Sequence, residues 1–270
     1  TEYTLGVVNG EVLSLAMFLA SVAFVLGLAD DLKRCRPVTK LIVQVLLGIA
    51  TIACVGIVYG LPLVLTVPAT IFGVVGLMNA VNIMDNMDGT ASGLLVLAMI
   101  GYALLGVLTN NLTVVLLSVT VAGASFGFLL HNKPPARIFM GDAGSLMLGY
   151  FLAVTGILVT HGVYQYKAVR LVVPLLIVGL FLTDTAFVVV WRKFHSQPIA
   201  RGDKNHLSHR LAKWFRGSEW KANGVLYGFQ VFLIVLAFGS TVTALWVSFL
   251  LFLIGLGSLL GLSWRLWRVT

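Results

Sequence analysis

Long apolar segments that alternate with short polar ones dominate this chain of 270 residues. Nine segments have the length of roughly 17 to 25 residues that an α-helix needs to cross a bilayer core about 30 Å thick. They lie at residues 12–29, 39–58, 66–83, 90–108, 112–130, 144–160, 169–191, 222–240 and 243–264. The pattern predicts an all-α fold, a polytopic membrane helical bundle of about nine transmembrane helices that forms one domain over residues 1–270.

The composition supports this interpretation, because 59% of the residues are hydrophobic and only 10% are charged. An ordinary soluble domain has about a quarter of its residues charged. Residue 1 is Thr, and no signal peptide precedes the first apolar segment, so we expect a truncated or processed chain. Cys35 and Cys54 lie toward opposite ends of a predicted span, and no disulfide is expected between them.

The basic residues predict the orientation of the bundle. Threading nine spans places segments 30–40, 84–89, 131–143 and 192–221, with the tail after residue 264, on one side. Sixteen of the eighteen Lys and Arg residues fall on that side, and only Lys167 and Arg170 fall on the other. Positive residues favour the cytoplasmic side, so these segments are predicted to be cytoplasmic loops. The net charge of +8 then reflects topology, with some attraction for anionic headgroups or phosphates, and gives no case for nucleic acid.

Five carboxylates meet at this predicted cytoplasmic face, where segments end or begin: Asp30, Asp31, Asp85, Asp88 and Asp142. Ionisable groups at membrane-embedded helix ends are costly and mark functional sites by default. Two adjacent carboxylates repel each other, and such a pair tends to have one raised pKa or a bound cation. For the first pair, a solvated charged turn is the alternative.

Polar residues recur every third position near residue 80, at Asn79, Asn82, Asp85 and Asp88. Residues three apart share a face if the local chain is helical. Buried carboxamides need hydrogen-bonding partners, so the two asparagines predict a polar site inside the span. The alternative is a polar loop in which Asp88 or Thr90 caps the next helix.

The segment that leads into the sixth span begins with Phe139 and reaches Gly141 and Asp142. Asp142 is either the cap of a helix or part of a site in which free backbone N–H groups at a helix start bind phosphate or a metal–phosphate. The candidate ligands here carry oxygen donors without a Cys–His set. This donor type favours Mg²⁺, with Mn²⁺ as a second choice, over zinc.

The longest predicted loop contains His206 and His209, which fit one face of a short helix. With Lys204 and Arg210 they predict a cationic cradle for phosphate or sugar. A zinc site and a solvated basic loop are the alternatives. Asp184 lies inside a predicted span and is expected to pair with a buried donor.

Four motifs, in this order and on one predicted face, resemble the polyprenyl-phosphate N-acetylhexosamine-1-phosphate transferases of glycosyltransferase family 4. The motifs are Asp30-Asp31, Asn79-x-x-Asn82-x-x-Asp85-x-x-Asp88-Gly89, Phe139-Met140-Gly141-Asp142-x-Gly144-Ser145 and His206-x-x-His209. The last motif and the span after 222–240 are similar to the branch that uses UDP-N-acetylglucosamine. Relatives that use UDP-MurNAc-pentapeptide typically have a histidine triplet there and end one span earlier.

Two departures from this family pattern stand out. About two spans and a loop that precede the Asp-Asp motif in the family are absent here. Asn86 stands where many members have Gly, at a backbone position that the resemblance places against uracil. Asn tolerates a left-handed backbone better than most residues, so the turn is expected to persist.

The resemblance implies transfer of a HexNAc-1-phosphate, GlcNAc-1-phosphate by preference, from a UDP-sugar to polyprenyl (undecaprenyl) phosphate, with release of UMP. This would be the first membrane step of lipid-linked cell-envelope glycan synthesis. Asp142 would be the principal Mg²⁺ ligand, helped by Asn82 or Asp85, while Phe139 would stack on uracil and Asp88 would hydrogen-bond its edge.

The other implied roles concern the acceptor and the diphosphate. Asp30 would take the proton of the acceptor phosphate or orient it, with Asp31 as its neighbour and Asp85 as a further catalytic residue. Asn86 would belong to the nucleotide site. The residues that would hold the phosphate or sugar are Asn79, Lys204, His206, His209 and Arg210.

The expected setting is the bacterial inner (plasma) membrane, with membrane lipid around the chain and the active site facing the cytoplasm. A homodimer is left open. The rival interpretations are a cation- or proton-coupled transporter and an inactive homologue of the transferase. A transporter predicts polar residues across the whole bilayer, whereas the outer halves of these spans are nearly all apolar. The donor sugar, the lipid length and the choice between direct attack and a covalent intermediate are not fixed by the sequence.

Overall fold

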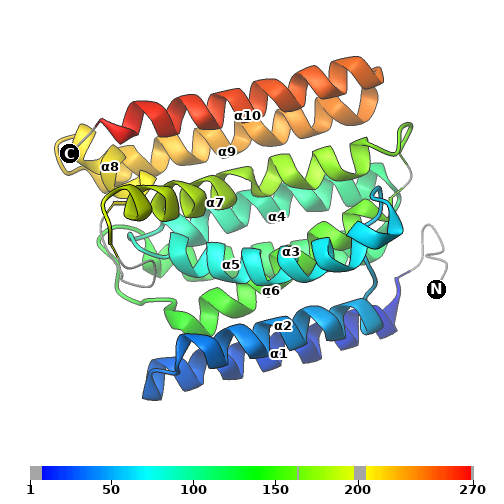
Figure 1. The fold of residues 1–270 in the computed structure, drawn as a ribbon, viewed down its shortest axis with the longest axis horizontal. Helices are drawn as coiled ribbons and strands as arrows, with labels where there is room; N and C mark the ends of the chain where they lie inside the picture. Colours follow the sequence, from blue (N-terminus) through cyan, green and yellow to red (C-terminus); the bar gives the residue numbers. More distant parts are fainter. Residues whose placement is uncertain (1–7, 163, 198–204, 269–270) are drawn as a thin grey trace.

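The computed structural model describes residues 8–162, 164–197 and 205–268, and all regular elements of these segments are α-helices (Figure 1). In chain order the helices are α1 (Gly10–Lys33), α2 (Pro37–Cys54), α3 (Leu63–Met84), α4 (Thr90–Leu108), α5 (Leu112–Asn132), α6 (Gly141–Thr160), α7 (Val169–Phe194), α8 (Leu207–Trp214), α9 (Glu219–Val242) and α10 (Leu245–Trp267).

Nine of the helices in the described residues are long and apolar enough to cross a membrane, and the exception is α8, with eight residues. The predicted helical bundle is therefore confirmed. Two predicted boundaries were wrong by four residues, because the span expected at 12–29 continues to Lys33 and the span expected at 39–58 ends at Cys54. The backbone N–H groups of Val55 and Gly56 both turn back to Thr51 O, and Gly56 takes a left-handed conformation with φ 126°.

Helices α4 and α6 form the interior of the bundle. In their most apolar windows 72% and 78% of the residues are buried, against 22% in α2 and 17% in α10. Figure 1 shows the helices running side by side, with α1 and α2 along one edge and α9 and α10 along the opposite edge. The last residues of α1, α3 and α10 and the short helix α8 lie at the left end in that view, and we call this end of the bundle the acidic end.

Two glycines allow the close helix contacts that build the acidic end. A Cβ on Gly27 of α1 would lie 2.2 Å from the carbonyl oxygen of Asp142. A Cβ on Gly149 of α6 would lie 2.6 Å from the Cα of Met78 in α3. Only glycine permits such approaches of one backbone to another. As a result, the ends of α1 and α3 both lie against the first turns of α6.

Candidate active site

The N-terminus of α6 is capped by a residue of another helix. The two oxygens of the Asp31 carboxylate accept hydrogen bonds from the backbone N–H groups of Asp142, at 2.9 Å, and Ala143, at 3.0 Å. Gly141 has φ 64°, and a Cβ there would lie 2.8 Å from Asp31 Oδ2. A carboxylate at this position also interacts favourably with the positive end of the helix dipole.

This arrangement corrects two expectations for the start of α6. Asp142 is not the helix cap, because the helix begins at Gly141 and Met140 holds the cap position without a side-chain bond. The N–H groups of Asp142 and Ala143 are not free to bind phosphate, since Asp31 already accepts from them. The prediction that these two N–H groups bind an anion was therefore wrong.

A lysine that the sequence analysis missed joins two of the predicted acidic residues. The Nζ of Lys40 in α2 donates to Asp30 Oδ2 at 2.9 Å and also to Asp142 Oδ2. The other oxygen of Asp30 accepts from the backbone N–H of Cys35 at 2.6 Å. The available signal was a lysine inside the predicted span 39–58, because a charge within a span has a partner or a function.

Asn82 of α3 lies beside Asp142, as the predicted metal set requires. Its Nδ2 donates to Asp142 Oδ1 at 2.8 Å and to Ser145 Oγ at 2.9 Å. One turn earlier, Asn79 exchanges hydrogen bonds with Gln44 of α2, at 2.8 and 3.4 Å. Because the Asn79 amide is occupied by this helix–helix pair, the structure gives it a packing role in place of the predicted contact with phosphate or sugar.

Asp85 follows the last residue of α3 and completes the carboxylate group. Burial, with the negative charges of Asp142 and Asp88, raises the pKa of Asp85 to about 6. The two neighbouring carboxylates therefore add to the effect of burial and disfavour the ionised form of this carboxyl. A bound cation would offset their repulsion.

The donor chemistry of this group fits a hard divalent cation. Asp142, Asn82 and Asp85 offer carboxylate and carboxamide oxygens, the ligand type of Mg²⁺ and Mn²⁺. Within the described segments, no three His, Cys, Asp or Glu side chains are already gathered as a metal cluster. Asn82 donates a hydrogen bond to Asp142, and Asp142 also binds Lys40.

The turn between α3 and α4 differs from the sequence expectation. It is not helical, since α3 ends at Met84, and Gly89, with φ 75°, precedes α4 without a side-chain cap. Neither Asp88 nor Thr90 is therefore the cap that we considered. Instead Asp88 Oδ2 accepts from the N–H of Ala136 at 2.8 Å.

This hydrogen bond holds the segment before α6, which carries Phe139, against the turn after α3. The side chain of Phe139 is 77% exposed at the acidic end. A planar base could stack on this ring without displacing core residues. The predicted roles of Phe139 and Asp88 toward uracil stay predictions.

Asn86 connects the same turn to the short helix α8. Its Nδ2 donates to Ile83 O at 2.9 Å, and its Oδ1 accepts from Ser208 Oγ at 2.7 Å. His209 Nε2 lies 3.0 Å from the backbone oxygen of Asn86. The expected left-handed conformation was wrong, because the left-handed residue of the turn is Gly89, with φ 75°, and Asn86 has no positive φ.

The predicted short helix at the histidine motif is confirmed as α8, which begins directly after His206. The buried Asp184 pairs as expected: it accepts from His206 Nδ1 at 2.8 Å and from the N–H of Leu207 at 2.7 Å. Among the described residues no third ligand joins the histidines, so the zinc alternative has no support. Lys204, the remaining basic residue of the predicted cradle, lies outside the described residues.

Arg210 requires a correction. It is only 2% exposed, and its Nη1 donates to the carbonyl oxygens of Leu266, at 3.0 Å, and Trp267, at 3.2 Å, at the end of α10. Its guanidinium also lies over the rings of Phe187 and Trp191, at 5.3 and 5.4 Å from their centroids. The side chain is thus buried in packing between helices and does not form the predicted cradle.

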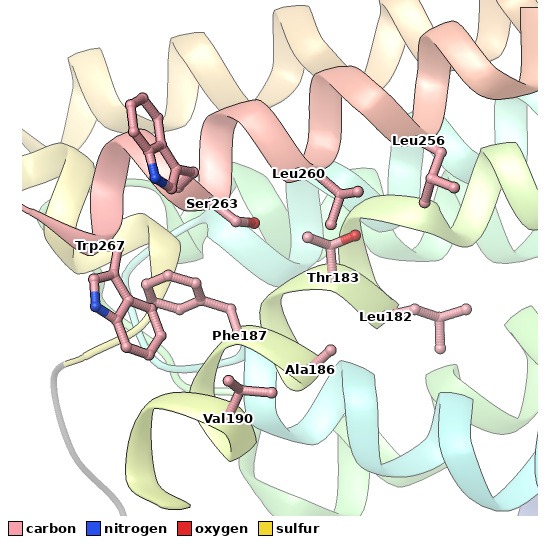
Figure 2. A pocket seen from close by; sticks show the side chains of 10 residues that line it. Leu182, Thr183, Ala186, Phe187, Val190, Leu256, Leu260, Ser263 and Trp267 are labelled. Atoms are coloured by element: carbon pink, nitrogen blue, oxygen red, sulfur yellow. The ribbon is translucent and has the colours of Figure 1, made fainter. Parts of the chain in front are cut away.

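An apolar hollow between α7 and α10 adjoins this packing (Figure 2). Phe187 and Trp267 lie next to each other at one end of it, with their rings edge to face at 5.6 Å. No charged residue is among the ten that line the hollow. This hollow therefore contributes no charged group to the site at the acidic end.

The fold and this site define a polytopic membrane protein whose carboxylates converge at one end of a helical bundle. The chain belongs to glycosyl transferase family 4, whose sequence model matches residues 13–160, just over half of the chain. The family resemblance is thus confirmed. The matched region includes the five clustered carboxylates and ends before α7 and α8.

Individual relatives extend the match. A probable undecaprenyl-phosphate N-acetylglucosaminyl 1-phosphate transferase of Bacillus subtilis is 34% identical over 205 residues, which cover 71% of this chain and 56% of that protein. Phospho-N-acetylmuramoyl-pentapeptide-transferases of Caldanaerobacter subterraneus and Streptococcus thermophilus are 31% and 33% identical, over 68% and 58% of this chain and 52% and 47% of theirs. The chain spans about half the length of these curated relatives.

Proposed function

We propose that this chain transfers GlcNAc-1-phosphate from UDP-GlcNAc to undecaprenyl phosphate and releases UMP, as a first membrane step of lipid-linked cell-envelope glycan synthesis. The observation that carries the proposal is that Asp30 and Asp142, from two separate helix ends, share Lys40, while Asn82 binds Asp142 and Asp85 lies near enough to interact with the charge of Asp142. The similarity to the Bacillus subtilis protein and the His-x-x-His motif support the choice of donor.

The orientation follows from the distribution of charge. Sixteen of the eighteen Lys and Arg residues belong to the segments that the sequence predicts on one side, which would be the side of the acidic end. By the positive-inside rule this end would face the cytoplasm of a bacterial inner membrane. A nucleotide-sugar made in the cytoplasm could then reach the carboxylates, while the polyprenyl chain of the acceptor stays in the bilayer.

The reaction joins one phosphate to another. An oxygen of the acceptor phosphate attacks the β-phosphorus of the UDP-sugar, and the bond from that phosphorus to the oxygen of the departing UMP breaks. The main barrier is repulsion between negatively charged groups. Asp142, Asn82 and Asp85 would hold Mg²⁺ or Mn²⁺, whose charge would offset this repulsion when bound.

Lys40 adds a fixed positive charge at the same place. A phosphate monoester with a second pKa near ~6 is largely a dianion at neutral pH and needs no strong base. Both oxygens of Asp30 already accept hydrogen bonds, from Lys40 and from Cys35 N–H. We therefore assign Asp30 to holding Lys40 in place, in preference to the proton-acceptor role that the resemblance implied.

The nucleotide would lie along the turn after α3 and the segment before α6. Phe139 offers an exposed ring for uracil, and Asp88 and Asn86 fix the two backbone segments on either side. His209, whose Nε2 lies 3.0 Å from the backbone oxygen of Asn86, would contact the diphosphate or sugar beside this turn.

A direct assay tests the proposal. The purified chain in detergent or liposomes is incubated with UDP-GlcNAc carrying ³²P at the β-phosphate, undecaprenyl phosphate and Mg²⁺ or Mn²⁺. We expect the label to move to the lipid fraction while unlabelled UMP is released, and Asp142→Ala to abolish both. If wild-type chain produces no labelled lipid with either metal, the proposed activity is wrong for this chain. Replacement of the donor by UDP-GalNAc tests the choice of sugar.

A further inference from the structure

Asp184 is a buried carboxylate for which the reaction scheme above has no use. It lies in the middle of a transmembrane helix, α7, and is 0% exposed. A buried carboxylate is retained only where its partners compensate for lost hydration. Here both partners belong to one short stretch, His206 and Leu207, at the start of α8.

We propose that Asp184 is a positioning residue that acts through Nδ1 of His206, and that His206 anchors α8 instead of touching the substrate. The proposal rests on the proposed transferase function for its activity readout. It reverses the role that the family resemblance implies for this histidine. His209 is then the residue of the motif that contacts the turn after α3, next to Asp85.

The hydrogen-bond geometry fixes which atom of His206 is used. A carboxylate can only accept, so Nδ1 of His206 must carry the proton that it donates to Asp184 Oδ2 at 2.8 Å. Asp184 Oδ1 accepts from the N–H of Leu207, the first residue of α8. One carboxylate therefore orients the imidazole ring and satisfies a free N–H group at the helix start.

Burial separates the two histidines of the motif. His206 is 4% exposed, while the ring of His209 is only partly buried and its Nε2 lies 3.0 Å from Asn86 O. Ser208, between them, donates to Asn86 Oδ1 at 2.7 Å. The middle of α8 thus contacts the turn that carries Asp85, whereas its first residues are bound to α7.

Arg210 supplies a second anchor on the same short helix. It binds the last carbonyl oxygens of α10 and is flanked by Phe187, which lies beside Trp267 in Figure 2. A helix of eight residues is marginally stable by itself, so its position depends on such contacts. With α8 held to α7 and to α10, Ser208 and His209 keep a fixed position against the turn after α3.

Two isosteric substitutions of His206 separate anchoring from substrate contact. The side-chain amide of Asn places its nitrogen close to the position of Nδ1, and the amide of Gln places its nitrogen close to Nε2. In the transfer assay we expect His206→Asn to keep turnover within about threefold of wild type. We expect His206→Gln and Asp184→Asn to lose on the order of 10²-fold, as for a displaced reacting group.

The reverse order, with His206→Gln active and His206→Asn inactive, would show that Nε2 contacts the substrate and would overturn the proposal. The same two substitutions at His209 are the matched control, and there Gln is expected to be tolerated better than Asn. Size-exclusion elution as a monodisperse peak and the thermal unfolding temperature of each variant distinguish a displaced α8 from loss of the whole fold.

A second measurement does not depend on activity. In protein labelled with [¹⁵N]histidine, the His206 ring should show a proton on Nδ1 in the wild type, and this signal should be lost or shifted in Asp184→Ala. A His206 ring protonated on Nε2 alone in the wild type would sink the inference. If the wild type does not transfer phosphosugar, the proposed function fails, while this spectrum still decides the pairing of Asp184 with His206.

Discussion

Asp31, at the end of the first described helix, accepts a hydrogen bond at 2.9 Å from the backbone N–H of Asp142, which is 111 positions away in the sequence. Its second oxygen accepts from the next N–H, that of Ala143. The contact ties the end of α1 to the start of α6. Asp30 and the side chain of Asp142, which share Lys40, are thereby held at a fixed separation.

Loss of this interhelix cap should reduce stability. Asp31→Ala removes both acceptors and is expected to lower the free energy of unfolding by roughly 0.5–2 kcal/mol, the range for helix caps. Asp31→Asn keeps one acceptor oxygen, and its stability should lie between that of Asp31→Ala and that of wild type. Thermal unfolding in detergent measures the order of the three proteins. Equal stability of Asp31→Ala and wild type would show that the cap contributes nothing.

The same junction depends on Gly27. A Cβ there would lie 2.2 Å from the carbonyl oxygen of Asp142, which is backbone and cannot rotate away. Gly27→Ala should therefore separate α1 from α6 and cost about 1–3 kcal/mol, as overpacking does. Gly76→Ala in α3 is the matched control, because a Cβ at Gly76 meets nothing within 4 Å. A melting temperature of Gly27→Ala equal to that of the control would contradict the close approach.

Lys40 should link stability to divalent cations. Lys40→Met leaves the partly buried carboxylates of Asp30 and Asp142 without their cation, at a cost on the order of 1–3 kcal/mol. In EDTA this variant should melt below wild type, and Mg²⁺ should raise its melting temperature more than that of wild type. Lys33→Met, at an exposed position at the end of α1, should show neither effect. An equal response of both variants to Mg²⁺ would argue against a cation site beside Lys40.

The bundle could be predicted from sequence because each span carries its own signal. A run of apolar residues long enough to cross a bilayer must satisfy its backbone groups internally, so it forms a helix whatever lies beside it. The pairing of Asp184 was predictable for a related reason. A carboxylate inside such a run needs a donor, although the sequence did not identify His206 as that donor.

The contacts within the site were less predictable, since they join helices distant in the chain. Lys40 meets Asp142 across 102 positions, and its place inside a predicted span indicates a partner without identifying which residue that partner is. Arg210 stands next to the histidine motif, and that proximity suggested a phosphate cradle. Its burial against α10 is decided by tertiary packing, which a local spacing does not encode.

Phe139 should contribute to nucleotide affinity through stacking. Its ring is 77% exposed next to the segment that Asp88 fastens. Phe139→Ala is expected to weaken UMP binding by about 1–3 kcal/mol, the range for a stacked base, and to leave the KM for the lipid acceptor nearly unchanged. Ile138→Ala removes an adjacent exposed apolar side chain and is the control. Isothermal titration with UMP measures the difference, and identical affinities for the two variants would remove Phe139 from the nucleotide site.

At the opposite end of the bundle, His161 should make stability depend on pH. Burial, together with the charge of Arg170, lowers the pKa of His161 to about 4, even though its Nε2 faces the carbonyl oxygen of Ile57 at 2.8 Å. In the unfolded chain the pKa returns to about 6.5. Between these values the unfolded state binds more protons than the folded state, so stability must rise with pH.

The contribution of His161 is therefore complete above about pH 6.5 and is lost progressively as the pH falls toward 4. Over that interval the loss can reach about 3 kcal/mol, since one pKa unit corresponds to about 1.4 kcal/mol. His161→Gln keeps a nitrogen donor for Ile57 O but cannot titrate, so its melting temperature should fall less than that of wild type between pH 7 and pH 4.5. Parallel pH profiles for the two proteins would mean that His161 titrates normally in the folded state, and that other groups cause the acid sensitivity.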